Sequence, residues 1–352
     1  MDSNASTLII LTPGFPENES DSTCLPAQQA FVRSINATHP ATKIIILSFQ
    51  YPFLKSEYLW HGNQVIAFGG KNRGNISRLL LWGKVWQTLN KIYKSHQIAG
   101  ILSFWCGECA LVASRFARKK NLAHYCWILG QDARKNNHYV NRIKPHATEL
   151  IVMSDFLQKE FFKNHSIYPA HTITNGINAR VSLKNNGIRD IDVLGAGSLI
   201  QLKQFDIFIG LIQKLKYELG EIRSVICGNG PEQGLLQTLI EEQRLTGTVT
   251  LLPEQRHMDV IKLMERSRIL LHPSSYEGFS TVCLEALYAG AHVISFCKPM
   301  NNGINHWHVV KNKDEMFRKL LMLLKDPALD HRPQCPYNMH DSAKQIMHLF
   351  SQ

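Results

Sequence analysis

Short runs of apolar residues alternate along the chain with longer segments in which apolar residues recur every three to four positions. The short runs are typical of buried strands, and the longer segments are typical of amphipathic helices. Strands that alternate with helices predict an α/β fold, in which helices cover both faces of a parallel sheet. In the first half we expect a helix near 25–35 and strands at 8–12, 43–49, 100–104, 125–129 and 149–153.

The alternation pauses at residues 174–190, which are rich in Asn, Gly and polar residues and are typical of a linker. It then resumes, and 352 residues suffice for two domains of about 100–200 residues each. We therefore expect two Rossmann-like, doubly wound domains, over 1–178 and 179–335, that face each other across an interdomain cleft. A last helix is expected within 336–352. Strands of the second domain are expected at 192–196, 224–227, 249–252, 269–272 and 292–295.

Positive charge is concentrated in the first half of the chain. The whole chain has 39 Lys and Arg against 28 Asp and Glu, a formal net charge of +11. Residues 1–180 hold 20 of these basic residues against 10 acidic ones, so that half accounts for +10. This imbalance predicts an anionic partner for the first half, such as a membrane or a phosphate-bearing substrate. Nucleic acid is not expected, because the sequence has no recognition helix, zinc-finger or RNP-type motif.

The compartment is inferred from the cysteines and from the N-terminal sequence. No apolar stretch reaches the roughly 18 residues of a membrane span, and the N-terminus lacks the pattern of a signal peptide. Eight cysteines without a signal peptide predict free thiols in the cytoplasm. Cys106 and Cys109 have the Cys-x-x-Cys spacing of redox proteins, but with no second pair and no His/Cys ligand cluster we interpret them as packing thiols.

The most informative segment spans residues 272–290. A buried strand ends at His272, a turn follows, and Ser280 or Thr281 is expected to cap a helix. The amides at the start of that helix suit a diphosphate, because its charge complements the positive end of the helix dipole. Gly278 allows the backbone to approach such a ligand closely.

Two carboxylates of the same segment are candidate ligands for sugars. Glu277 precedes the helix and can accept hydrogen bonds from sugar hydroxyls, whereas Glu285 lies about one turn inside it and can accept from a ribose diol. The alternative is an ordinary strand–turn–helix unit with one capping and one solvated glutamate.

Residues 277–286 resemble the Glu-Gly-Phe-Gly/Ser-x4-Glu-Ala signature of the retaining glycosyltransferases of family 4, which have the GT-B fold. The resemblance extends over nearly the whole chain and is strongest across 195–296. It implies that the C-terminal helix crosses back to the first domain. Further matching segments are Thr12–Pro16, Asn175–Ile177, Gly197–Lys203 and Gly228–Glu232.

The resemblance implies a nucleoside-diphosphate-sugar as co-substrate and assigns roles to single residues. Glu277 would bind the donor sugar, Glu285 the ribose, and Lys203 would neutralise the departing diphosphate. Ser198 stands where the family has an arginine, which removes one cation from this site. Expected donor-binding residues are Gly14, Ser198, Lys203, Gly228, Asn229, Gly230, Gly278, Phe279, Ser280, Thr281 and Glu285.

Two acidic residues of the first half are candidates for the acceptor side. The loop Leu129–Ala133 resembles the family's His-Gly-x-Asp loop, although Leu129 replaces the histidine. Asp132 matches and is expected to contact substrate in the catalytic site, with a loop or capping role as the alternative. Glu108 follows a strand and is an acceptor-side or donor ligand, or else a helix cap.

Residues 73–94 predict a basic amphipathic helix. One stripe is expected to hold Leu79, Trp82, Trp86, Leu89 and Tyr93, and the basic residues are Arg73, Arg78, Lys84, Lys91 and Lys94. Such a helix lies either on an anionic bilayer or against the sheet with its basic face in water. Packing against the sheet is the first expectation; the resemblance adds some weight to the bilayer, because related enzymes often act on lipid-linked acceptors at the cytoplasmic membrane face.

The resemblance implies a retaining hexosyltransferase that moves a sugar to a glycan or lipid-linked acceptor, in surface polysaccharide or glycolipid synthesis. A GT-B epimerase or phosphorylase is the alternative. A nicotinamide oxidoreductase is disfavoured, because neither Gly195-Ala-Gly197 nor Gly228-Asn-Gly230 completes the Gly-x-Gly-x-x-Gly fingerprint. Asp190-Ile-Asp192 has the spacing of metal-dependent transferases but precedes a strand. No metal or cofactor is expected, since Lys203 and a helix terminus supply the positive charge.

Overall fold

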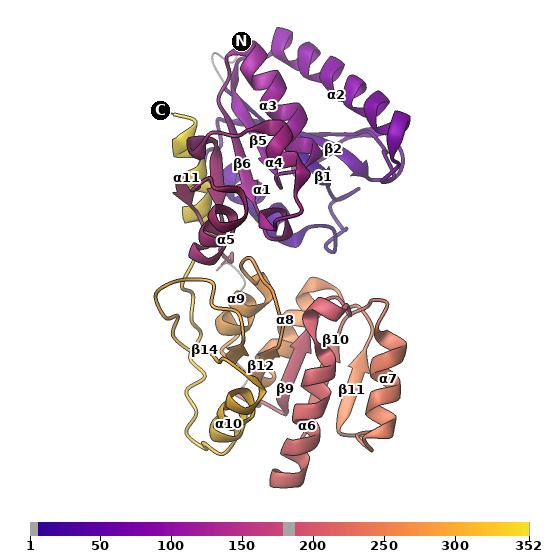
Figure 1. Cartoon of the computed structure of the whole chain (residues 1–352), viewed down its shortest axis with the longest axis vertical. Coiled ribbons are helices and arrows are strands. Elements are labelled where there is room, and N and C mark those ends of the chain that lie inside the picture. The colour runs from indigo at the N-terminus through magenta and orange to yellow at the C-terminus, as the bar shows by residue number, and fades with distance from the viewer. Residues whose placement is uncertain (1–5, 179–186, 352) are drawn as a thin grey trace. The chain divides into compact units, whose positions relative to one another are not determined.

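The computed structural model describes residues 6–178 and 187–351 and divides into two compact units (Figure 1). The N-terminal unit comprises Met1–Asn178 together with Asn338–Gln352, and the C-terminal unit comprises Ala179–Tyr337. Residues 179–186 of the predicted linker lie outside the described residues.

The N-terminal unit is built on an eight-stranded sheet of order β3-β4-β2-β1-β5-β6-β7-β8. All neighbouring strands are parallel except β3 and β4, which form an antiparallel pair at one edge. The strands are β1 (Thr7–Gly14), β2 (Lys43–Tyr51), β3 (Ser56–Trp60), β4 (Asn63–Ala67), β5 (Ile98–Phe104), β6 (His124–Ile128), β7 (Leu150–Val152) and β8 (His171–Thr172). The helices are α1 (Pro26–Thr38), α2 (Asn75–Ser95), α3 (Glu108–Lys120), α4 (His138–Ile143), α5 (Asp155–His165) and α11 (Met339–Leu349).

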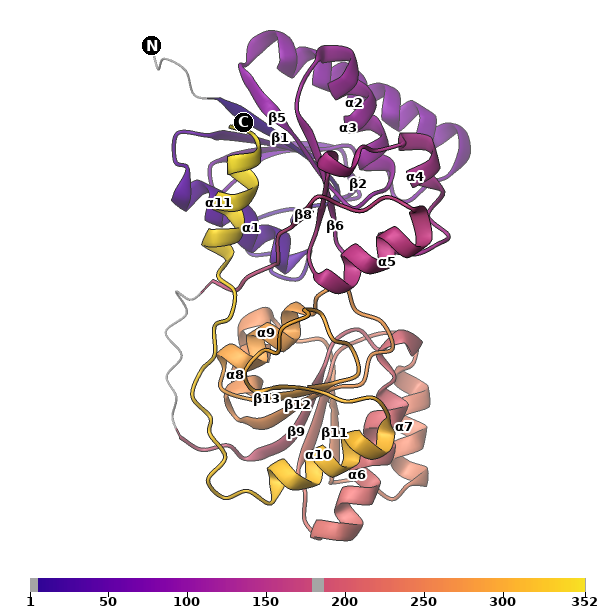
Figure 2. The same cartoon turned by 60° about the vertical axis from the view of Figure 1, so that its left-hand side comes forward.

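Helices cover both faces of this sheet, as Figure 2 shows. On one face, α2 and α3 bury Val85, Leu89 and Phe116 against β1, β2 and β5. On the other face, Phe31 of α1 stacks edge-on against Trp127 with ring centroids 4.9 Å apart. These aromatic and branched side chains are fully buried, so they supply much of the unit's hydrophobic stabilisation.

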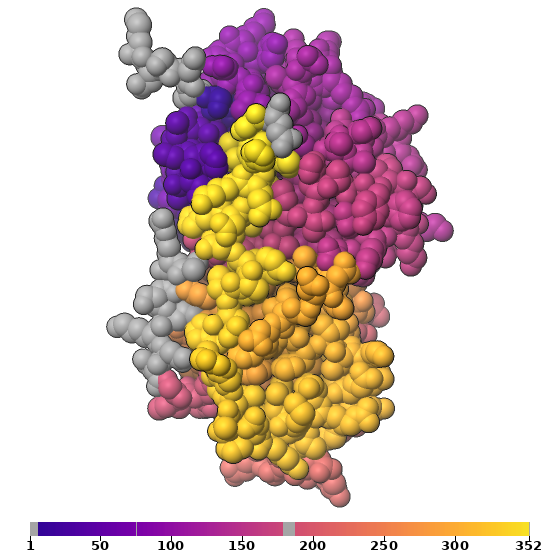
Figure 3. Space-filling model, turned by 90° about the vertical axis from the view of Figure 1, so that its left-hand side faces the viewer, coloured from indigo at the N-terminus to yellow at the C-terminus, as the bar shows by residue number. Residues whose placement is uncertain are grey.

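The C-terminal helix α11 belongs to the N-terminal unit and packs beside α1 (Figures 2 and 3). The Tyr125 hydroxyl donates a 2.9 Å hydrogen bond to the Leu349 carbonyl. The Phe350 ring occupies the space above Gly100, where any Cβ would lie 2.4 Å from the ring. Leu349 and Phe350 are therefore part of the packed structure of this unit.

The C-terminal unit has a six-stranded, fully parallel sheet of order β11-β10-β9-β12-β13-β14. Numbered along this unit the order is 3-2-1-4-5-6, the doubly wound Rossmann arrangement, with its switch point between β9 and β12. The strands are β9 (Ile191–Ala196), β10 (Ser224–Cys227), β11 (Val249–Leu252), β12 (Ser267–His272), β13 (His292–Ser295) and β14 (Trp307–Val309). The helices are α6 (Phe205–Leu219), α7 (Gln233–Glu242), α8 (His257–Glu265), α9 (Thr281–Tyr288) and α10 (Lys313–Leu324).

The α/β prediction and the ten expected strands are confirmed, but four short strands at or next to the edges of the sheets were not predicted. These are β3, β4, β8 and β14, which have two to five residues each. Three of the five residues of β3 are exposed, and Trp60 at its end is buried. Such strands lack the continuous apolar run of a central parallel strand, which is the signal that identified the others.

The expected apolar stripe of residues 73–94 is wrong at both ends, because Leu79 and Tyr93 are exposed. The buried face of α2 consists of Leu81, Val85, Leu89 and Ile92, whereas the Leu79 side chain is 63% exposed. Trp82 and Trp86 lie at the border and are half-buried. Apolar residues occur on more than one side of this helix, so more than one stripe with a spacing of three to four residues can be drawn, and spacing alone does not identify the buried one.

Candidate functional site

The loops that leave β9 and β12 lie on either side of the switch point of the C-terminal sheet. In doubly wound sheets, ligands bind at this point, outside the carboxyl ends of the strands. A single turn of 3₁₀ helix, Gln201–Lys203, follows β9. The Ser275 amide from the other loop donates a 3.0 Å hydrogen bond to the Leu202 carbonyl, so the two loops are tied together.

Lys203 and Glu277 meet at this point. The Lys203 ammonium donates a hydrogen bond to Glu277 Oε1, and His272 Nε2 lies 3.1 Å from the same oxygen. Both charged side chains are 18% exposed. Burial disfavours the charged carboxylate, but the His272 hydrogen bond and the charge of Lys203 outweigh it and lower the pKa of Glu277 to about 2. Glu277 is therefore ionised at neutral pH.

His272 is a member of this network that the sequence analysis did not identify. It is the last residue of β12 and is buried, and burial lowers the pKa of its imidazole. A neutral ring donates from Nε2 to the ionised Glu277. Ser280 Oγ lies 3.3 Å from the same nitrogen. The available signal was a polar residue, His272, directly after the apolar run Ile269–Leu271 of a buried strand.

Ser280 or Thr281 was expected to cap α9 through its hydroxyl, and among the described residues the structure shows no such bond at the N-cap. Ser280 is the N-cap, but within the described part of the chain its hydroxyl makes no capping hydrogen bond and faces His272 instead. Thr281 is the first helical residue. Phe279 is buried and packs 5.5 Å from the Tyr337 ring, so its side chain belongs to the core of the unit rather than to a ligand surface.

Two glycines bring the loop after β10 against the loop after β9. A Cβ on Gly228 would lie 1.9 Å from the Gly197 carbonyl oxygen, and one on Gly230 would lie 2.3 Å from that of Leu199. The Leu199 amide also donates to the Asn229 carbonyl at 2.9 Å. These glycines are required for close packing of the loops. Two polar residues of these loops, Asn229 and Ser198, are exposed. Ser198 is the residue that replaces an arginine in the motif it resembles.

Glu285 lies one turn inside α9 and is 14% exposed. His257 Nε2, from the first residue of α8, lies 2.7 Å from its Oε1. The sequence motif identified the carboxylate, but it gave no indication of this partner.

The acidic candidates of the N-terminal unit have structural roles. The Asp132 carboxylate accepts hydrogen bonds from the amides of Cys106 and Gly130, both at 2.8 Å, and from Leu129 at 3.2 Å. Burial raises the pKa of Asp132, and these amides oppose the rise. Asp132 thus organises the loop after β6, which was the alternative to a substrate contact.

Glu108 is also held within the N-terminal unit. Its carboxylate accepts hydrogen bonds from the Gln50 side-chain amide and, at 3.0 Å, from Trp82 Nε1. Arg78 Nε lies 4.0 Å away. Gly107 rather than Glu108 is the N-cap of α3, so the expected capping role is wrong. Gly14 ends β1, where its carbonyl accepts a 2.7 Å hydrogen bond from Thr12 Oγ1.

The acidic residues of the Asp190-Ile-Asp192 motif are engaged in ion pairs. Asp190 pairs with Arg223 and Arg266, and an Arg268 nitrogen lies 3.6 Å from Asp192. No group of three or more His, Cys, Asp or Glu side chains among the described residues has the geometry to hold a metal ion. None of the eight cysteines, all of which lie within the described residues, forms a disulfide. Burial raises the pKa of the Cys109 thiol, which opposes the reactive thiolate that a redox motif requires.

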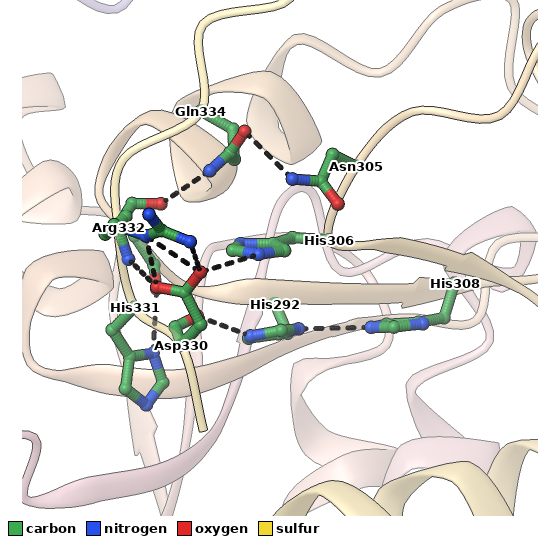
Figure 4. A network of polar contacts seen from close by, with 9 residues as sticks. His292, Asn305, His306, His308, Asp330, His331, Arg332 and Gln334 are labelled. Atoms are coloured by element: carbon green, nitrogen blue, oxygen red, sulfur yellow. Dashed lines mark hydrogen bonds and ion pairs between the residues drawn. The ribbon is translucent and has the colours of Figure 1, made fainter. Parts of the chain in front are cut away.

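Four histidines, which the sequence analysis also missed, form a cluster at the edge of the C-terminal sheet (Figure 4). The His292 ring stacks on His306 at 4.3 Å between centroids, and its Nδ1 lies 3.1 Å from His308 Nε2. His331 Nδ1 lies 2.8 Å from the Gly290 carbonyl oxygen. Burial lowers the pKa of both His308 and His331 to about 4. His308 and His331 are therefore neutral at pH 7.

We expect the C-terminal unit to lose stability as the pH falls from 7 to 4. The unfolded histidines take up protons near pH 6.5, whereas the folded ones resist protonation until about pH 4. Allowing for solvent screening, the loss of unfolding free energy is about 2 kcal/mol. Calorimetric unfolding at several pH values measures it. His308→Gln should flatten the profile and the control His171→Gln should not; an unchanged profile in His308→Gln would contradict the expectation.

Comparison with known proteins places this architecture in a structural class. The structure superposes on HepE from Anabaena, crystallised with UDP and glucose, with a TM-score of 0.70 and 15% identity over 98% of this chain and 99% of that one. The neighbours are GT-B glycosyltransferases, so the chain has the GT-B fold.

Sequence comparison finds a glycosyltransferase family match in the C-terminal unit. Residues 182–338 match the family model described as "Glycosyl transferases group 1". A phosphatidylinositol N-acetylglucosaminyltransferase subunit of Schizosaccharomyces pombe is 38% identical over 26% of this chain. An N-acetylgalactosaminyltransferase of Campylobacter jejuni that acts on a diphospho-undecaprenol-linked acceptor is 26% identical over 62% of it. The matched segments span only 20% and 65% of these relatives' own lengths.

Proposed function

We propose that the protein is a retaining glycosyltransferase of family 4 that transfers an N-acetylhexosamine from a nucleoside-diphosphate donor. The observation that carries this is the Lys203–Glu277 pair at the switch point of the C-terminal sheet. The unit that contains this pair matches the glycosyltransferase family model. The printed activities of the S. pombe and C. jejuni relatives support the choice of sugar.

In this reaction the bond between the sugar's anomeric carbon and the diphosphate breaks, and a bond to the acceptor oxygen forms. Lys203 stabilises the negative charge that develops on the leaving phosphate, which is the role that a metal ion plays in other transferases. Glu277, anchored through Oε1, accepts hydrogen bonds from the donor sugar. We propose front-face transfer, in which the departing phosphate takes up the acceptor's proton.

The proposal is tested with UDP-, GDP- and ADP-linked N-acetylglucosamine. One of them should raise the thermal unfolding temperature of the protein, because a ligand that binds only the folded state stabilises it. With a suitable acceptor, nucleoside diphosphate should be released and the product should keep the anomeric configuration of the donor. An absence of stabilisation by all three donors would contradict the proposal.

We further propose that the acceptor is lipid-linked, within surface polysaccharide or glycolipid synthesis, and that α2 contacts the cytoplasmic membrane face. Near the start of α2, the side chains of Ile76, Leu79 and Leu80 are 74%, 63% and 62% exposed. Lys71 and Arg73 are exposed immediately before them. Exposed apolar residues beside basic ones suit an anionic bilayer surface. Within the described residues, none of the helices has both the length and the apolar character of a membrane span.

We expect the protein to sediment with vesicles of phosphatidylcholine and phosphatidylglycerol at low salt and to be released at high salt. Leu79→Ser/Leu80→Ser should weaken this binding about tenfold, because two exposed apolar side chains are removed. Leu235→Ser is the matched control, since Leu235 is 56% exposed on α7 of the other unit. Equal sedimentation of both variants would exclude α2 as the contact.

A further inference from the structure

We propose that His257 is a positioning residue for Glu285, holding this carboxylate in the orientation that binds the ribose diol of the nucleotide. The inference rests on the proposed function, because it takes a nucleoside diphosphate to bind at the carboxyl end of the C-terminal sheet. It adds a residue from a second helix, α8, to a site that the sequence motif confines to α9.

The geometry of the pair determines which atom carries the proton. His257 Nε2 and Glu285 Oε1 are 2.7 Å apart, which is a normal charge-assisted hydrogen-bond length. An ionised carboxylate only accepts hydrogen bonds, so the imidazole carries hydrogen on Nε2 and donates it. Because this bond occupies Glu285 Oε1, Oε2 is the oxygen left to accept a hydrogen bond from a ligand hydroxyl.

Glu285 is more buried than His257, as expected if Glu285 binds the ligand and His257 holds it in place. The Glu285 side chain is 14% exposed, whereas that of His257 is 37% exposed at the rim. A glutamate side chain has three rotatable bonds, and ordering it during binding opposes association. Because His257 orders the carboxylate before the ligand arrives, that cost is reduced.

The start of α8 does not depend on His257 for its structure. Arg256, the N-cap, pairs with Asp259 at 2.8 Å, and Asp259 also pairs with Lys262 at 3.0 Å. Replacing the His257 side chain should therefore leave the helix in place, so that a change in binding reports on Glu285.

The test uses calorimetric titration with two probes. The first is whichever of UDP, GDP and ADP binds wild type most tightly, and the second is its 2′-deoxy form, which lacks one hydroxyl of the diol. His257→Phe keeps an aromatic ring without the donor, and His257→Gln keeps an N–H donor. Met258→Ala is the matched control, because Met258 is the next residue of α8 and is 47% exposed.

We expect His257→Phe to weaken binding of the ribonucleotide about tenfold and to change binding of the 2′-deoxy form less than about twofold. His257→Gln and Met258→Ala should remain close to wild type for both probes. In a Glu285→Ala background, His257→Phe should produce no further loss.

Three results overturn the inference. His257→Phe could weaken both probes equally, it could weaken neither, or its effect could persist in the Glu285→Ala background. Each of these leaves the proposed function intact, because wild type still binds the nucleotide. Failure of wild type to bind any of the three nucleotides would instead contradict the proposed function, and the inference with it.

Discussion

Glu277→Gln should lower kcat/KM for transfer about 10²–10³-fold while the protein remains folded. The substitution keeps the size of the side chain but removes the negative charge that Lys203 and His272 contact. The amide accepts more weakly from sugar hydroxyls than the carboxylate does, and Lys203 loses its partner. Initial rates with the stabilising donor, measured beside circular dichroism spectra, check the expectation.

A double mutant separates the role of Glu277 in the reaction from its role in stability. Because the pair is mostly buried, either Glu277→Gln or Lys203→Met alone leaves one charge uncompensated and should cost about 1–3 kcal/mol. Lys203→Met/Glu277→Gln removes both charges and should recover part of that stability. Activity should stay lost. A double mutant that regained activity together with stability would show that the pair is only structural.

Gly228→Ala should destabilise the C-terminal unit by about 3 kcal/mol and weaken nucleotide binding. The added methyl group would lie 1.9 Å from the Gly197 carbonyl oxygen, which is a backbone atom in the loop that leads to Lys203. The loop after β9 must move to relieve this contact, and Lys203 moves with it. Urea unfolding and titration with the nucleotide measure the two effects.

Gly234→Ala provides a control of the opposite sign in the same part of the unit. Gly234 lies in α7, and a Cβ there meets nothing within 4 Å among the atoms of the described chain. Replacing a helical glycine with alanine should therefore raise stability by about 0.5–1 kcal/mol. If Gly228→Ala were as stable as Gly234→Ala, the close approach of the two loops would be wrong.

Much of the fold was predictable from the sequence because central parallel strands are buried on both faces. Such strands read as continuous apolar runs, and β9 to β13 were found within about two residues of their bounds for that reason. The edge strands β3 and β14 are short and partly exposed, so their side chains carry no comparable signal.

The candidate site was predictable in part. Lys203, Glu277 and Glu285 were identified because each lies in a short segment that resembles a family motif. Asp132 also lay in such a motif, yet the structure shows its carboxylate occupied by backbone amides of its own unit. A motif records which residue types are adjacent in the chain, and it does not record how many hydrogen bonds a side chain already accepts.

By itself, the sequence determined the α/β class, the loops after the strands, and the positions of Glu277 before α9 and of Glu285 within it, because these depend on neighbouring positions. Only the tertiary structure decided which side chains meet. Lys203 and Glu277 are 74 positions apart and are brought together because β9 lies next to β12. His257 reaches Glu285 across 28 positions. Such contacts depend on the order of strands in the sheet, which long-range packing sets and local patterns of polarity do not specify.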